Sequence, residues 1–407
     1  MKPRTNLTAF LLATVLWQSA AAVAAQPAWS FGGARVVVLS GTHRERGVAH
    51  GKALAAEVLD VVDNYVLESL NPLLYSVMVS RIDKLMIVDA DMQAEAEGLV
   101  AGAREALGGN LRSGRLLRDI GWKDVVALNM YVDYVGAGCS SLSAWGDATM
   151  NSDLKERAVI ARNLDWSLSD ALLRNQVLFI HLPSEAGEKP FVSVGFAGFV
   201  GCLSCMSETG LAAFLNLGFG SRSGSFPPDY RFAPVSLTLR RGVEMPSSED
   251  PVGTSVKTLT SAPRVGSFIV HVLSAASRPG GPAVVVELVS DGQAERQAAD
   301  EKDLKGCFLV ATNHHRKVSR PVECRRYETA REQARLHLGG FGPAEMWKLA
   351  ARVRRDDTMQ SMLFVPATGE LWLAVRGPGG AGIPEPEKTN LRDLIDKARK
   401  RLPATLP

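Results

Sequence analysis

The stretch "VGAGCSSLSAWGDATMNSDLKERAVIARNLDW", residues 135–166, lies where the character of the chain changes. From Thr42 to Tyr134 apolar residues recur at helical spacing, and one amphipathic run ends at Gly108-Gly109. After Cys139 come short runs rich in β-branched and aromatic residues, separated by Gly, Pro or Asp-Gly, which is typical of strands. A helical front followed by many antiparallel-type strands predicts an α+β layered fold rather than a doubly wound one.

The expected strands all lie beyond this stretch or at its end. They are residues 157–162, 176–182, 190–196, 211–219, 283–289, 306–312 and 361–366. Helices are expected at residues 233–243, 250–262 and 390–402, the last after a Gly/Pro-rich linker at 377–387, and a helix before the stretch is expected to run up to Gly136.

The first residues have the pattern of a secretory signal peptide. Lys2 and Arg4 precede an apolar run over residues 7–17, and small residues follow to Ala25. We therefore expect residues 1–25 to be removed at Ala25-Gln26, or within two residues of it, and the protein to be periplasmic or secreted. With 46 Lys plus Arg against 43 Asp plus Glu, the charge of +3 gives no electrostatic reason to expect a nucleic-acid partner.

The chain has an odd number of cysteines, so an exported form leaves one unpaired within the chain. They are Cys139, Cys202, Cys205, Cys307 and Cys324. The C-x-x-C at 202–205 lacks a thioredoxin-like context and a zinc-spaced histidine, so it predicts a disulfide or two core thiols. Cys139 differs because Gly138 precedes it and two small polar serines follow, which leaves the thiol accessible.

A Gly-Cys bond is suited to self-cleavage. The thiol of Cys139 attacks the carbonyl of Gly138 through a five-membered ring, which glycine crowds least. Cleavage frees the α-amine of Cys139, whose pKa near 7.7 to 8.0 suits a general base for a thiol with a pKa near 8.5. One residue would then supply both nucleophile and base.

Several motifs together carry a resemblance to a known family. They are "GTHRERGVAHGKALAAEV", "DVVALNMYVDYVGAGCSS", "VIARNLDW", "GFVGCLSCMSETGLAAFLNLGF", "APVSLTLRRGV", "VVVELVSDG", "FLVATNHH" and "CRRYETAR", in this order. The chain resembles the isopenicillin-N acyltransferase-like N-terminal-nucleophile hydrolases, which are related to the choloylglycine hydrolases and acid-ceramidase-type amidases. The resemblance covers nearly all of the expected mature chain and implies a four-layer αββα sandwich.

The resemblance assigns roles around the new terminus. Cys139 matches the nucleophile, and Arg162 and Asp165 match the pair that positions the freed amine and thiol. Because residues three apart on a strand face opposite sides, we expect Asp165 to lie beyond a bend. An ordinary surface ion pair is the alternative for these two residues.

Three further residues match the site of that family. Asn216 matches the oxyanion-hole asparagine, Asn313 a second polar residue, and Arg326 a supporting arginine. Arg325 is an alternative to Arg326, because Glu323-Cys324 stands where small hydroxyl residues are usual.

The resemblance thus implies a cysteine amidase or acyltransferase that acts on a linear or cyclic amide without a metal or cofactor. Self-cleavage would divide the exported chain into residues 26–138 and 139–407, which remain together as a heterodimer. The partners would be a small amide or N-acyl substrate and, in transfer, an acyl acceptor.

Two other functions are open. One is a thiol hydrolase with an ordinary histidine base, for which His181 and His271 are candidates, and which would not cut itself. The other is an inactive exported ligand-binding protein of the same fold. The adjacent His314-His315 would point to opposite faces of a strand, which disfavours a shared metal.

Overall fold

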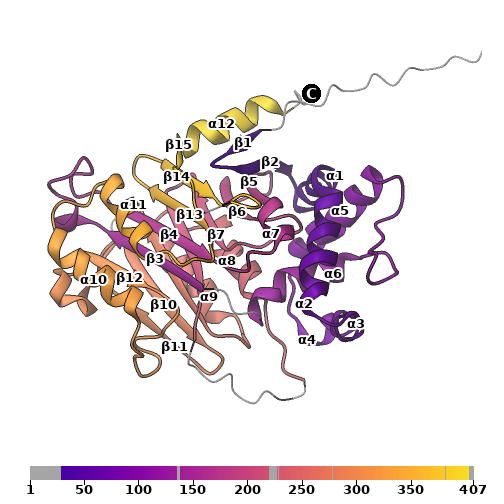
Figure 1. The fold of residues 1–407 in the computed structure, drawn as a ribbon, viewed down its shortest axis with the longest axis horizontal. Helices are drawn as coiled ribbons and strands as arrows, with labels where there is room; N and C mark the ends of the chain where they lie inside the picture. Colours follow the sequence, from indigo (N-terminus) through magenta and orange to yellow (C-terminus); the bar gives the residue numbers. More distant parts are fainter. Residues whose placement is uncertain are drawn as a thin grey trace, which may run out of the picture.

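The structure is a computed structural model that describes residues 29–134, 138–219, 227, 229–276, 278–380 and 382–402. Two β-sheets form its centre (Figure 1). The nine-stranded sheet has the order β1 (Ser30–Phe31), β2 (Ala34–Gly41), β5 (Gln176–Pro183), β6 (Phe191–Phe196), β7 (Ser204–Ser207), β8 (Leu211–Leu217), β9 (Phe268–Ser274), β10 (Ala283–Val289) and β11 (Gly292–Arg296). The six-stranded sheet has the order β12 (Phe308–Ala311), β3 (Gly138–Ala144), β4 (Val159–Asp165), β13 (Thr358–Val365), β14 (Glu370–Val375) and β15 (Glu387–Asn390).

Helices cover the outer face of each sheet. In the N-terminal segment they are α1 (His43–Val61), α2 (Leu67–Ser69), α3 (Pro72–Ser80), α4 (Ile82–Leu85), α5 (Ala90–Ala106) and α6 (Trp122–Met130). Later in the chain they are α7 (Asp170–Arg174), α8 (Val235–Glu244), α9 (Pro251–Ser261), α10 (Arg325–His337), α11 (Pro343–Arg352) and α12 (Leu391–Arg401). Short π or 3-10 turns occur at Val62–Val66, Tyr131–Asp133, Gly146–Ala148, Ala298–Asp300 and Lys302–Leu304.

The layers follow from the alternation of side chains along the strands. Ile180 and Val192 of the large sheet and Ile160 and Phe364 of the small sheet belong to one buried cluster and lie on the facing sides of the two sheets. On the outside, α8 and α9 pack on β8 and β9, and α11 packs on β4 and β13. The α+β fold with αββα layers is therefore confirmed.

The N-terminal segment is built around a close pair of helices, α1 and α5 (Figure 1). Glycines make this approach possible: a Cβ on Gly47 would lie 2.0 Å from the carbonyl oxygen of Glu95, and one on Gly98 would lie 2.2 Å from that of Arg44. The backbones therefore nearly touch, and side chains beside the contact are held at short range.

The strands expected from the sequence are all present, and so are the three later helices, within a few residues at each end. The helical front differs in two ways. It is preceded by β1 and β2, of which β2 pairs in parallel with β5, and α6 ends at Met130 before a 3-10 turn. Residues 135–137, with the expected helix end at Gly136, and the signal peptide at residues 1–25 lie outside the described residues. In the described ranges no helix combines the length and apolar character that a membrane span needs.

Candidate active site

Strand β3 lies between β4 and the edge strand β12 of the small sheet, and it carries Cys139 as its second residue. Opposite β3, the register pairs Gly138 with Asp165 and Cys139 with Leu164. Directly opposite residues of antiparallel strands share a face, so successive residues of β3 look alternately toward the large sheet and toward the outer helices. The site is therefore divided between the two faces of one sheet.

The thiol lies on the face toward the large sheet, beside a buried cation. Arg162 donates to Cys139 Sγ at 3.4 Å and to Asn216 Oδ1 at 3.1 Å, and its side chain is fully buried. Burial raises the pKa of the Cys139 thiol, and the guanidinium of Arg162 opposes this by favouring the thiolate. Burial also lowers the pKa of Arg162. An exposed surface pair, the alternative for Arg162, is excluded by this burial.

Asn216 presents its donor end inside the site. Because its Oδ1 accepts from Arg162, its Nδ2 is the donor, and it reaches Ser141 Oγ at 3.3 Å and the Thr312 carbonyl at 3.4 Å. Both contacts are long for N–H···O bonds. An amide donor held this weakly can turn to a developing oxyanion, which is the role required of an oxyanion-hole residue.

The opposite face holds the backbone side of Cys139. A Cβ on Gly138 would lie 3.1 Å from the Asp165 carboxylate, so only glycine leaves this approach unstrained. Asp165 accepts from Arg326 Nη1 at 2.6 Å and from Thr358 Oγ1 at 2.7 Å. Burial raises the pKa of Asp165, and Arg326 opposes the increase. The expected bend was wrong: Asp165 is the last residue of β4, and the irregularity lies in β13, between Thr358 and Gln360.

Asn313 connects this carboxylate to the nitrogen of the nucleophile. The Cys139 backbone N–H donates to Asn313 Oδ1 at 2.9 Å, and Arg326 Nη2 donates to the same oxygen at 2.7 Å. Arg326 thus bridges Asp165 and Asn313, whereas Arg325 is exposed. The geometry selects Arg326 of the two arginines.

The two histidines proposed as alternative bases bond to serines and not to the thiol. His181 Nε2 lies 3.2 Å from Ser193 Oγ, and His271 lies between Ser141 Oγ at 3.1 Å and Ser143 Oγ at 2.8 Å. Burial lowers the pKa of His271 to about 3 and that of His181 well below its usual range. Both are neutral near pH 7, and neither is placed as a base for Cys139.

Sequence reasoning missed two contacts of the site. Thr358 fixes Asp165 from a strand 193 residues further along the chain. Ser141 links Asn216 to His271 and lies on the face of Cys139 because it is two residues beyond it. Strand alternation offered a signal for Ser141, and nothing local offered one for Thr358.

The remaining cysteines lie apart from this chemistry. Cys202 and Cys205 form a disulfide, one of the two expected alternatives, and Cys307 and Cys324 are buried and free. Cys139 is the third free thiol among the described residues.

Comparisons with known proteins give distant likenesses, and no protein-family model matches the chain. Two Dictyostelium discoideum proteins match in sequence. Protein dcd1B is 29% identical over 89 residues, 22% of this chain and 17% of its own, and protein dcd1A is 25% identical over 191 residues, 42% of each chain. The chain thus spans less than half the length of either relative.

Among solved structures, three similar ones are named as an amidase, an acylase and a hydrolase. A Caenorhabditis elegans N-acylethanolamine-hydrolyzing acid amidase ortholog has a TM-score of 0.43 at 18% identity, covering 56% of this chain and 93% of its own. Penicillin V acylase from Agrobacterium tumefaciens has a TM-score of 0.39 at 14% identity, and the match covers 58% of this chain and 83% of its own. A mutant conjugated bile acid hydrolase from Clostridium perfringens has a TM-score of 0.38 at 10% identity, and the match covers 62% of this chain and 93% of its own.

Proposed function

We propose that this chain is an exported, self-processing cysteine amidase or acyltransferase that cuts its own Gly138–Cys139 bond and then breaks a substrate amide through a thioester on Cys139. One observation supports this most directly. The two ends of the nucleophilic residue have separate partners, Arg162 at the sulfur and Asn313 at the backbone nitrogen. Any buried N–H in a strand needs a partner, but a structural cysteine needs no buried cation at its sulfur.

The self-cleavage step conserves atoms and charge. The Cys139 sulfur bonds to the Gly138 carbonyl carbon, the C–N bond breaks, and the thiol proton ends on the departing nitrogen. Water then attacks the resulting thioester, which leaves a Gly138 carboxylate and restores the thiol. The freed amine begins next to Asn313 Oδ1, with Asp165 held nearby by Arg326.

The substrate reaction repeats this chemistry with an external amide. The amine takes the thiol proton, the sulfur attacks the substrate carbonyl, and Asn216 Nδ2 donates to the oxyanion. The leaving amine takes up the proton. Water or another acceptor then releases the acyl group, so hydrolysis and transfer differ only in what attacks the thioester.

A denaturing gel with terminal sequencing tests the proposal. The exported protein should give two bands, residues 139–407 beginning at Cys139 and a smaller one beginning at Gln26 or within two residues of it. A single chain, or a large band with another first residue, would contradict the terminal-amine mechanism. The purified protein should then release amine and acyl product from a member of a panel of N-acyl compounds.

Thiol labelling separates this proposal from an inactive binding protein. After cleavage a catalytic Cys139 should react with iodoacetamide much faster than Cys307 and Cys324, since its freed amine can take the thiol proton and Arg162 opposes the effect of burial on the thiol pKa. A binding protein has no need of a reactive thiol, so uniform slow labelling of the three cysteines would favour it.

A further inference from the structure

A cluster of buried charges joins the N-terminal helices to the rest of the chain, away from the residues that contact Cys139. Its six members come from α1, α5, the turn after β5, and α8. They are His43, Arg46, Glu95, Glu188, Arg240 and Glu244, which we call the ionic clasp, and each side chain is at most 2% exposed.

The strongest contacts of the clasp run across the proposed cut. His43 Nε2 bonds Glu188 Oε1 at 2.9 Å, and Arg46 bonds Glu188 at 2.8 Å and Glu244 at 2.6 Å. In the other direction, Arg240 donates two parallel hydrogen bonds to the Glu95 carboxylate, at 2.8 and 2.7 Å. Each side of the cut therefore contributes both cations and anions.

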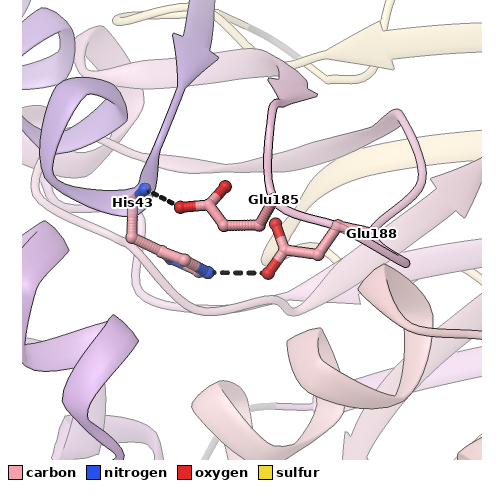
Figure 2. Close-up of side chains that lie close together, drawn as sticks. All are labelled: His43, Glu185 and Glu188. Atoms are coloured by element: carbon pink, nitrogen blue, oxygen red, sulfur yellow. Dashed lines mark hydrogen bonds and ion pairs between the residues drawn. The ribbon is translucent and has the colours of Figure 1, made fainter.

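Part of the clasp has the composition of a metal site. His43, Glu185 and Glu188 offer ligand atoms within 4.8 Å of one another (Figure 2). However, the ring nitrogens of His43 are already engaged with carboxylates. Nδ1 lies 2.8 Å from Glu95, and Nε2 lies 2.9 Å from Glu188. Glu188 also accepts from Arg241 at 2.9 Å. A divalent cation would have to enter beside these guanidinium groups, against their repulsion.

A proton balances the clasp without a metal. Both ring nitrogens of His43 face carboxylate oxygens, at 2.8 Å from Glu95 and 2.9 Å from Glu188, so each must carry a proton to donate, and the ring is then a cation. Burial opposes that charge, but hydrogen bonds to Glu188 and Glu95 raise the pKa of His43 to about 9. Further charges lie at the rim. The Glu185 carboxylate accepts from the His43 backbone N–H, and Arg241 pairs with Asp89 and Asp91 as well as with Glu188 and Glu244 of the clasp.

The geometry points to a specific role: beside the β2–β5 pairing, the ionic clasp holds α1 and α5 of the N-terminal segment against α8 and the turn after β5, and it is locked by a proton on His43 and not by a metal ion. Its partner is thus the chain's own N-terminal segment, whether the link at Gly138 is intact or cut. Only the fragment-release measurement below rests on the proposed self-cleavage.

Two matched variants test the role of burial. Glu188→Gln keeps the size of the side chain but removes the charge shared by His43 and Arg46. The control, Arg174→Gln, breaks the exposed pair of Arg174 with Asp60 of α1, which also crosses the cut. Hydrogen exchange of α1 in the full-length protein at pH 7 should speed up by about 100-fold or more in Glu188→Gln and by less than about tenfold in Arg174→Gln. Equal effects would overturn the clasp.

The wild-type protein supplies a test that does not depend on the folding of a variant. Protection of α1, corrected for intrinsic exchange, should be greatest below about pH 6.5 and fall progressively as the pH rises to about 9. Zinc, manganese or calcium at 1 mM, or a chelator, should not change it. Protection that rises with one of these ions, or that shows no alkaline loss, would overturn the proton lock.

Fragment release distinguishes this inference from the proposed function. If a gel shows a cut chain, gel filtration in increasing urea should release residues 26–138 at a lower concentration from Glu188→Gln than from Arg174→Gln. If the chain is intact, self-cleavage fails, and the exchange measurements still decide whether the clasp stands.

Discussion

Replacing Arg162 by glutamine removes the cation that faces the Cys139 thiol while leaving a hydrogen-bond donor in its place. Two unit charges 3.4 Å apart at an effective dielectric constant of about 20 attract by about 5 kcal/mol. The guanidinium charge is spread over three nitrogens, and one of them donates to Asn216, so the attraction at the sulfur is weaker than this figure. We expect the thiol pKa to rise by about two pH units, within the range that an opposite charge at this distance produces.

This change should appear as a slower self-cleavage with an altered pH dependence. Below the thiol pKa, two pH units reduce the thiolate fraction by about 100-fold, which is about 2.7 kcal/mol. Chains made by cell-free synthesis can be sampled over time on denaturing gels from pH 6.5 to 10. The half-time in Arg162→Gln should lengthen by about 100-fold at pH 7.5, and the inflection of the rate should move upward by about two pH units.

Arg162→Lys is the matched control, because it keeps the charge but cannot bridge the sulfur and Asn216 together. It should cut faster than Arg162→Gln with an inflection closer to that of the wild type. Thermal unfolding of all three proteins separates loss of fold from loss of rate. An unchanged inflection in a folded Arg162→Gln would refute the electrostatic reasoning, whatever the absolute rate.

Further predictions follow from the other contacts. Cys139→Ala should not be cut and Cys139→Ser should be cut slowly, as scored by the two bands on a gel. On a confirmed amide substrate, Asn216→Ala should lower kcat by about 100-fold or more. Ser141→Ala should lower kcat about tenfold with KM unchanged, and this effect should vanish in an Asn216→Ala background. The control Ser143→Ala also removes a hydrogen bond to His271 and should have little effect on kcat. A His43 pKa raised from 6.5 to about 9 stabilises the fold by at most about 3 kcal/mol, fully below pH 6.5 and decreasingly as the pH rises through 9. The free energies of unfolding of the wild type and His43→Gln, measured in urea, should therefore converge above pH 9.

The candidate site could be predicted in two ways. Cys139 is marked by its own neighbours, whereas Arg162, Asn216 and Asn313 follow from the family resemblance, whose motifs lie in or just after strands that β-branched and aromatic residues mark clearly. The strand β2 escaped prediction although it contains three consecutive valines, because the helical pattern that begins at Thr42 dominated the segment.

The long-range charge pairs could not be predicted for a different reason. Glu95 meets Arg240 across 145 positions, and His43 meets Glu188 across the same separation. Each residue alone has the sequence pattern of an ordinary charged helix or turn residue, which is usually solvated. They are buried because α1 packs closely on α5 and because side chains of both helices form ion pairs with α8.

The spacing of Arg162 and Asp165 shows how one strand can serve both ends of a terminal nucleophile. The Cys139 side chain points to one face of its strand, whereas its nitrogen lies in the plane of the sheet, next to Gly138. An odd separation of three places Arg162 on the face of the sulfur and Asp165 on the face of Gly138, beside the bond whose proposed cleavage would free the amine. The bend expected from the sequence would have brought both groups to one side. The straight strand instead keeps the cation that favours the thiolate apart from the carboxylate, so the two are not neutralised by pairing with each other, and Asp165 takes Arg326 as its own partner.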